Sequence, residues 1–157
     1  MRVVLAAVGR PRVPLAAAVA EYEARAARYW PFEAHEVREE PARGVTSPAA
    51  VDRVRALEGE RLLARAPTGA LVVACDERGE TWTSERFATW LRERRDEARD
   101  VAFVVGGAHG LAPAVREAAR VRLAVAPWTL PHEMARLVLA EQLYRAGTIV
   151  RGEPYHK

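Results

Sequence analysis

Short apolar runs alternate with helical segments along the whole chain, and this alternation restricts the fold more than any other feature. The runs RVVLAAV (2–8), ALVVAC (70–75), VAFVV (101–105) and VRLAV (121–125) are almost continuously apolar. Strands with this pattern are buried on both faces, as in parallel sheets that helices cover on both sides. The sequence therefore predicts an α/β fold with a mainly parallel sheet between layers of helices.

The other elements follow from alternation and from start and stop signals. FEAHEV (32–37) alternates and predicts a further strand. Ser47 before Pro48 is a capping residue followed by proline in the first turn, and Thr83 or Ser84 caps another helix. Helices are predicted over 15–29, 48–66, 84–97, 113–120 and 132–147, with polar loops over 39–48 and 76–84. We see no repeat and no domain boundary, so residues 1–157 are predicted to form a single domain.

Composition excludes several classes of protein. The one cysteine, Cys75, has no disulfide partner and the chain has no zinc spacing, which predicts a reducing, cytoplasmic setting and no metal. No apolar run approaches the roughly 20 residues that span a bilayer, so no membrane segment is expected. The net charge of +3 permits an anionic partner without requiring one.

A glycine loop, GGAHG (106–110), follows the predicted strand 101–105. In open α/β sheets ligands bind beyond the carboxyl ends of strands, and glycine lets the backbone approach a ligand closely. A tight turn without a ligand explains a glycine pair equally well. The dinucleotide fingerprint fits poorly. That motif is G-x-G-x-x-G after the first strand, with an acidic residue about 20 positions later. Here the pattern is GGxxG, and it follows the fourth predicted strand.

Two further segments are unusual. APWTLP (126–131) holds two prolines around Trp128, so it is stiff and extended and presents fixed backbone groups; a hydrophobic staple for the next helix is the simpler interpretation. The tail is basic and aromatic, and it is either frayed or a contact surface for phosphate and base. Its relevant residues are Arg145, Arg151, Tyr155, His156 and Lys157.

The order of GGAHGL, TLPHEMARLVLAEQLYRA and the terminal PYHK resembles the RlmH family over essentially the whole chain, and VVLAAVG and VVACDERGETWTS add to the likeness. These are SPOUT-class methyltransferases of ribosomal RNA. The resemblance implies an α/β-knot fold with a trefoil knot near the C-terminus. It also implies that the knotted loops bind S-adenosylmethionine.

Carried over residue by residue, the resemblance implies a set of cofactor-binding positions. Cys75 stands where the family usually has leucine, and a small thiol is expected to keep that wall apolar. The full set is Cys75, Gly106, Gly107, Ala126, Pro127, Trp128, Thr129, Leu130 and Pro131.

The resemblance also implies a homodimer, with the apolar face of the helix over 132–147 as its interface. The implied substrate is N3 of a pseudouridine in the helix 69 loop of large-subunit ribosomal RNA, within assembled ribosomes. We expect three tail residues to act on it. Arg145 stabilises a uracil anion or holds phosphate, Tyr155 stacks on the base, and His156 is the proton acceptor by residue type or a substrate contact.

Other functions remain open at this stage. A SPOUT enzyme of transfer RNA is the alternative within the same class. A ribosome-binding assembly factor without chemistry would use Arg10, Arg12 and the tail, and a nucleotide-binding regulator would bind the cofactor without transferring its methyl group. The remaining histidines and tryptophans are expected to pack or cap: His35, His109, His132, Trp30, Trp82 and Trp90.

Overall fold

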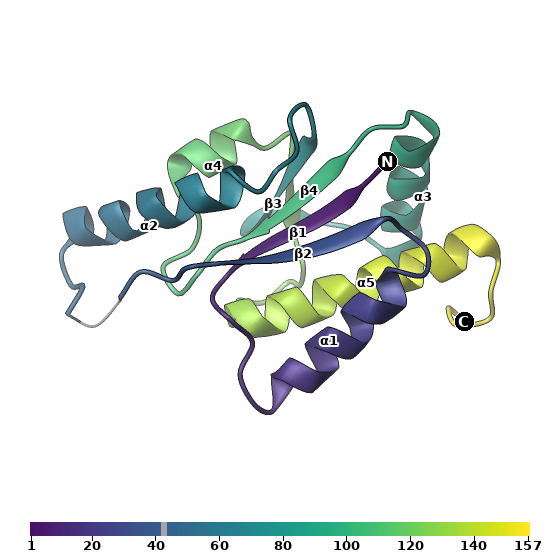
Figure 1. Cartoon of the computed structure of the whole chain (residues 1–157), viewed down its shortest axis with the longest axis horizontal. Coiled ribbons are helices and arrows are strands. Elements are labelled where there is room, and N and C mark those ends of the chain that lie inside the picture. Colours follow the sequence, from purple (N-terminus) through teal and green to yellow (C-terminus); the bar gives the residue numbers. More distant parts are fainter. Residues whose placement is uncertain (42–43) are drawn as a thin grey trace.

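The computed structural model describes residues 1–41 and 44–157, and these form one twisted sheet with helices on both faces (Figure 1). Every pairing in the sheet is parallel, and the strand order is β2-β1-β4-β3-β5. The strands are β1 (Val3–Val8), β2 (Phe32–Val37), β3 (Leu71–Thr81), β4 (Val101–Val105) and β5 (Val121–Ala124). The predicted α/β class and parallel sheet are confirmed.

Helices α1 and α5 lie on one face of the sheet with α3 beside them, and α2 and α4 lie on the other (Figure 1). Their bounds are α1 (Leu15–Ala26), α2 (Pro48–Leu63), α3 (Ser84–Asp96), α4 (Pro113–Ala118) and α5 (His132–Arg151). The two predicted caps are present. The Ser47 hydroxyl accepts from the Ala50 N–H at 3.2 Å, and the Thr83 hydroxyl accepts from the Arg86 N–H at 3.2 Å.

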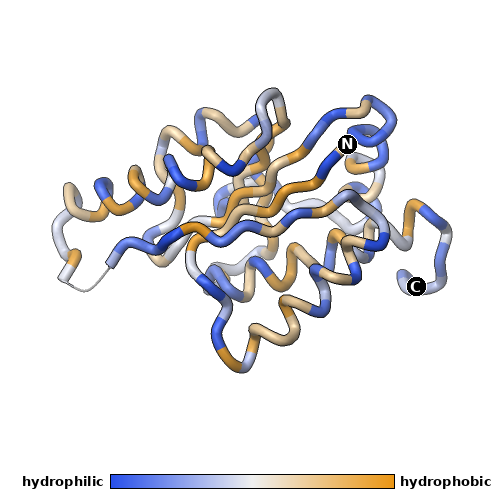
Figure 2. Tube along the Cα trace, viewed as in Figure 1, coloured by the Kyte–Doolittle hydropathy of each residue, from blue (hydrophilic) through white to orange (hydrophobic). Residues whose placement is uncertain are grey.

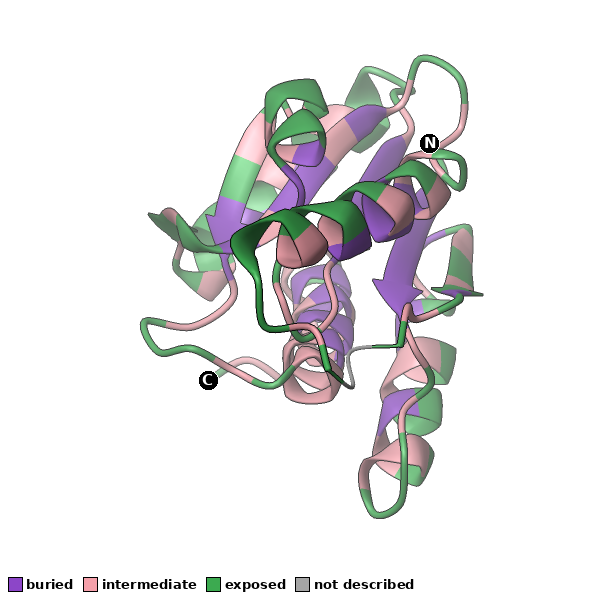
Figure 3. Cartoon of the chain, turned by 90° about the vertical axis from the view of Figure 1, so that its left-hand side faces the viewer, coloured by how far each residue is buried: buried purple, intermediate pink, exposed green. Residues whose placement is uncertain are grey.

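The strands are apolar on both faces because each face has its own core. In β1, Val3 and Leu5 pack in the cluster under α1, α3 and α5, whereas Ala6 and Val8 pack in the cluster under α2 and α4. Figure 2 shows apolar residues concentrated along the strands, and Figure 3 shows buried strands between helices whose outer surfaces are exposed. Full burial of one such leucine contributes roughly 1.5–3 kcal/mol to folding.

β3 is longer than the sequence predicts. The predicted loop over 76–84 is wrong for residues 76–81, which continue the strand. After Cys75 the pairing with β5 shifts register, and it resumes at Glu80 and Thr81. Gly79 allows this, because a Cβ there would lie 2.6 Å from the Arg122 carbonyl carbon. The extra strand therefore depends on contact with a segment about 40 residues away, which local polarity does not reveal.

α5 is also longer, and it continues through Gly147 to Arg151. The glycine is needed for packing, because a Cβ on Gly147 would overlap the side chain of Tyr29. The most buried stripe of α5, with Leu139 and Leu143, packs against the sheet within the same chain. The most buried part of the apolar face is therefore occupied within this chain, and the half-buried remainder of α5 is left for a partner; the dimer interface stays a prediction.

Two statements complete the fold. Residues 42–43, within the loop expected over 39–48, lie outside the described residues. No helix in the described ranges is long and apolar enough to cross a membrane. The trefoil knot stays a prediction.

Gly147→Ala tests the close packing of α5 against Tyr29, which follows α1. In an open helix this change stabilises by roughly 1 kcal/mol, because alanine is the better helix former. Here we expect destabilisation by about 1–3 kcal/mol, as in other overpacked sites. Thermal or urea unfolding measures the difference. In a Tyr29→Ala background the same change should cost less; stabilisation by Gly147→Ala in the unaltered chain would contradict the packing described.

Candidate functional site

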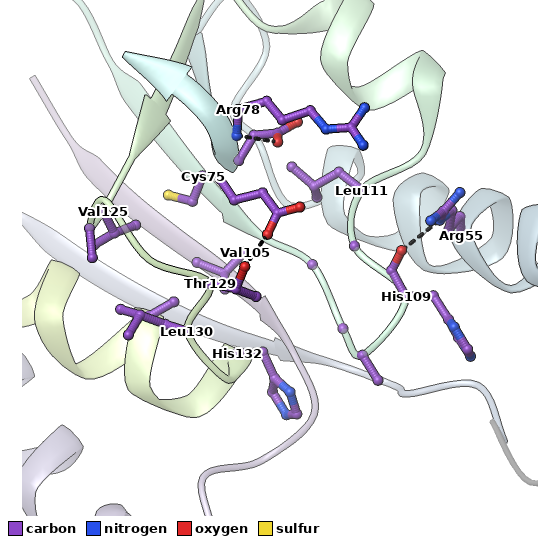
Figure 4. Close-up of a pocket in the computed structure, with 18 of the residues that line it drawn as sticks. Arg55, Cys75, Arg78, Val105, His109, Leu111, Val125, Thr129, Leu130 and His132 are labelled. Carbon is purple, nitrogen blue, oxygen red and sulfur yellow. Dashed lines mark hydrogen bonds between the residues drawn. The ribbon is translucent and has the colours of Figure 1, made fainter. Parts of the chain in front are cut away.

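A cavity of about 360 Å³ opens at the carboxyl ends of β3, β4 and β5 (Figure 4). Its volume lies within the range of small-molecule sites in proteins. The predicted cofactor positions that line it are Cys75, Gly106, Gly107, Ala126, Trp128, Thr129 and Leu130. Pro127 and Pro131 are not among the lining residues, so they flank the stiff segment rather than form the wall.

The sheet register explains why these loops meet. Cys75 pairs with Val105 of β4 on one side and with Leu123 of β5 on the other. The glycine loop begins immediately after Val105, and residues 126–131 follow β5 closely. Because all three strands are parallel, their carboxyl ends deliver both loops to one edge of the sheet.

The glycine loop is a tight turn fixed on α2. The Gly110 N–H donates to the Gly107 carbonyl at 3.0 Å, and Gly110 has a φ of +78°. A Cβ on Gly106 would lie 2.9 Å from the Gly110 carbonyl carbon. Arg55 of α2 donates through Nε to the His109 carbonyl at 2.6 Å. The glycines therefore make a tight turn and also leave bare backbone on the cavity wall; approach of a ligand to that backbone stays a prediction.

A buried carboxylate supports the opposite wall. Asp76, 6% exposed, accepts from the Arg78 N–H at 3.0 Å and is ion-paired with the Arg116 guanidinium of α4. Burial opposes ionisation of Asp76, but the hydrogen bonds from Arg116 and the Arg78 backbone outweigh it and hold the pKa of this carboxyl below its ordinary value. Asp76 thus stays charged at neutral pH and ties the middle of β3 to α4.

The next residue, Glu77, holds the proline-rich segment. The Thr129 hydroxyl donates to Glu77 Oε2 at 2.6 Å (Figure 4). Glu77 is exposed on the rim, so its carboxylate faces any ligand that enters. Trp128 is 77% exposed, which excludes the hydrophobic-staple interpretation within this chain.

The Cys75 thiol forms part of the apolar wall. Burial, followed by the nearby charge of Asp76, raises the pKa of Cys75 to about 12. The thiol is therefore neutral at physiological pH, as expected for a residue that replaces leucine.

Cys75 is predicted to resist alkylation in the folded protein. With a pKa of about 12, roughly one molecule in ten thousand carries the reactive thiolate at pH 8. Iodoacetamide should leave the native protein unlabelled over the time that fully labels it in denaturant, as followed by mass spectrometry. Labelling of the native protein at a rate close to that of the unfolded chain would show that the pKa of the Cys75 thiol is not raised.

The three predicted catalytic residues come together at the other end of α5. Arg145 donates to Glu141 Oε1 through Nε at 3.0 Å and lies 4.7 Å from the Tyr155 ring centre. The Tyr155 hydroxyl also donates to Glu141, at 3.0 Å. His156 lies between Arg145 (Nδ1, 3.3 Å) and Glu85 (Nε2, 2.7 Å). We call Glu141, Arg145, Tyr155 and His156 the tail cluster.

Hydrogen bonding fixes the charge states in the tail cluster. The pKa of Arg145 is raised, chiefly by Glu141, and the pKa of Glu85 is lowered to about 2 by its own backbone N–H and by His156. Arginine only donates, so His156 Nδ1 accepts from Arg145 and Nε2 carries the proton that Glu85 accepts. The imidazole therefore has a defined tautomer.

Within one chain the tail cluster and the cavity are separate. His132 and Ala135 line the cavity, whereas Arg145 lies ten residues beyond Ala135 on the same helix. At 1.5 Å per residue this is a separation of about 15 Å along α5. One chain thus brings the predicted cofactor residues together and the predicted catalytic residues together, but does not bring the two groups to each other.

Sequence reasoning missed several lining residues. Asp76 and Glu77 directly follow a buried apolar run, as Gly106 and Gly107 do. The same argument from position could therefore have marked them as candidate site residues. His132 was expected to cap or pack, yet it faces the cavity (Figure 4). Arg55 and Arg116 arrive from helices, and no local signal marks them. The packing roles predicted for Trp30, Trp82 and Trp90 are confirmed.

Comparison with known proteins identifies the family. A family model described as predicted SPOUT methyltransferase matches residues 1–156. The chain belongs to the SPOUT methyltransferase family. SPOUT relatives named ribosomal RNA large subunit methyltransferase H include a protein of Gemmatimonas aurantiaca, 62% identical over all of both chains, and one of Anaeromyxobacter sp. strain Fw109-5, 49% identical over all of both. The resemblance to the RlmH family is confirmed.

Two solved structures have a similar architecture. A probable methyltransferase from Bordetella pertussis Tohama I is 22% identical, with a TM-score of 0.53 over 93% of this chain and 94% of that one. TrmJ from Z. mobilis ZM4 is 16% identical, with a TM-score of 0.50 over 100% of this chain and 73% of that one. At these identities the likeness establishes the fold alone.

Proposed function

We propose that residues 1–157 act as a single S-adenosylmethionine-dependent methyltransferase domain, with a C-terminal trefoil knot, on large-subunit ribosomal RNA in the assembled ribosome. The target is N3 of a pseudouridine in the helix 69 loop. One observation carries the proposal: the glycine loop and the proline-rich segment meet in one cavity, in a chain with a 62% identical relative named ribosomal RNA large subunit methyltransferase H.

The residues around the cavity fit S-adenosylmethionine. The cofactor supplies an activated methyl group on a sulfonium, so it brings positive charge as well as an adenosine and an amino-acid part. Gly106 and Gly107 offer backbone for close approach, and Cys75 and Leu130 offer apolar surface that excludes water. Glu77, which accepts from Thr129, holds a carboxylate at the rim where a cationic group enters.

The tail cluster supplies groups for the nucleophile. N3 of the target base must lose its proton, and methyl transfer requires that N3 be aligned with the methyl group. His156 Nδ1 is the acceptor atom of the imidazole, and in this structure it accepts from Arg145. Once Arg145 turns to the developing uracil anion or to a phosphate, Nδ1 is released to take the proton. The Tyr155 ring stacks on the base.

A homodimer unites the two groups of residues. About 15 Å of α5 separates the tail cluster from the cavity in one chain, so we propose that the tail of one protomer reaches the cofactor of its partner. The half-buried face of α5, with Leu137 and Val138, remains for that contact.

The direct test is transfer of labelled methyl from S-adenosylmethionine into ribosomes that lack this methylation, followed by mapping of the modified nucleotide. We expect label in the helix 69 loop. Label in transfer RNA would favour the SPOUT alternative, and cofactor binding without any label would favour an assembly factor or regulator without chemistry.

The tail cluster is tested by His156→Ala and Arg145→Ala. Each should keep cofactor affinity and lower the rate of methyl transfer by about 10²-fold or more, as for loss of a general base or a charge stabiliser. Arg151→Ala is the matched control, because Arg151 lies outside the cluster and caps the Arg28 carbonyl. Near-normal turnover in both cluster variants would remove the tail from the active site.

Mixed dimers test whether the tail of one protomer acts on the cofactor of its partner or on the cofactor of its own chain. Gly106→Val should abolish cofactor binding, since even a Cβ at that position lies 2.9 Å from the Gly110 backbone. Random pairing of this variant with His156→Ala gives dimers in which one composite site is intact, and about a quarter of wild-type activity should return. No recovery on mixing would contradict a site shared between protomers.

A further inference from the structure

A second hollow, about 400 Å³ in volume, lies at the β5 edge of the sheet beside the cofactor cavity. Arginine is the most frequent residue in its lining, whereas the wall of the first cavity is mixed in composition. We call it the arginine groove, and it is lined by Arg78, Gly79, Glu80, Trp82, Arg86, Arg120, Val121 and Arg122.

The extension of β3 builds this groove. After the register shift between Cys75 and Glu80, β3 pairs again with Leu123 and Ala124 of β5. Gly79 allows the two backbones to come this close, because a Cβ there would lie 2.6 Å from the Arg122 carbonyl carbon. Arg122 lies in β5 and Arg120 directly precedes that strand, and both line the groove. Arg78 joins them from the β3 extension.

The groove carries positive charge that the protein does not neutralise. The side chains of Arg78, Arg120 and Arg122 are exposed and form no ion pair or hydrogen bond with any residue in the ranges 1–41 and 44–157. The one carboxylate of the lining, Glu80, accepts from Arg86 at 2.6 Å and from Trp82 Nε1 at 2.9 Å, so it is already engaged.

Several arginines elsewhere are paired with carboxylates. Arg2 pairs with Asp100 at 2.8 Å, and buried Arg136 pairs with Glu23 at 2.7 Å. Three unpaired guanidinium groups in one hollow repel one another, and such an arrangement favours an anion with several charges.

The arginine groove adjoins the proposed methyl-transfer site, since Arg78 lines both hollows. The charge of Arg122 also reaches the cavity wall, where it is one of the minor influences that lower the pKa of Asp76. A polyanion in the groove would therefore run directly past the cavity entrance.

We propose that the arginine groove binds successive backbone phosphates of the RNA substrate and so orients the target nucleotide at the cavity. This inference rests on the proposed function. Guanidinium forks match phosphate oxygens bidentately, and phosphate contacts fix the register of a nucleic acid without reading its sequence. The groove thus positions RNA, and recognition of the base belongs to the cavity and the tail cluster.

The test is the salt dependence of ribosome binding by the double variant Arg120→Gln/Arg122→Gln. Each lost phosphate contact lowers the slope of log K against log salt by about 0.7–0.9, so the slope should fall by about 1.4–1.8. Cofactor affinity, measured in parallel by calorimetry, should not change, because neither residue lines the cofactor cavity.

The matched control is Arg28→Gln/Arg38→Gln. These two arginines are also exposed, and they flank β2 at the opposite edge of the sheet, so net charge falls equally. Their slope should stay at the wild-type value. An unchanged slope in the groove variant, or an equal fall in both pairs, would overturn the proposal. Wild-type protein that binds ribosomes but transfers no methyl would refute the proposed function instead, and the slopes would still decide the groove.

Discussion

The pairing of β3 with strands on both sides determines where the candidate site of this SPOUT protein lies. Cys75 is the last residue of β3 in register with both neighbours, facing Val105 and Leu123. Because the strands are parallel, that junction collects the glycine loop, the proline-rich segment and Asp76 at one edge. Beyond it β3 changes register, and the same strand that forms the cavity wall goes on to form the arginine groove.

Local signals predicted most of the elements, and contacts between distant segments explain the differences. β1, β2 and β4 were predictable from their apolar or alternating patterns, and the caps at Ser47 and Thr83 require only neighbouring residues. The β3 extension and the last turn of α5 required partners roughly 40 and 120 residues away. Gly79 and Gly147 resemble breakers in sequence, but both are glycine because another segment leaves no room for a Cβ.

The candidate site divides in the same way. Residues that directly follow strands, such as Gly106 and Gly107, could be singled out by position, and the family resemblance supplied the ligand. Arg55 and Arg116 could not be singled out, because they reach the cavity only through helix packing on the other face of the sheet. The distribution of charge was also not predictable. The formal net charge of +3 does not reveal that Arg78, Arg120 and Arg122 lie together at the β5 edge of the sheet.

α5 touches the cavity at its first turn and holds the tail cluster near its last, with Glu141 and Arg145 on one side. The helix therefore fixes both the distance and the rotation between the cavity and the tail cluster. One inserted or deleted residue would shift everything beyond it by about 1.5 Å and rotate it by about 100°. Substitution at positions of this helix outside the tail cluster is therefore a matter of packing, whereas a change in the number of residues between the cavity and the cluster re-aims the tail.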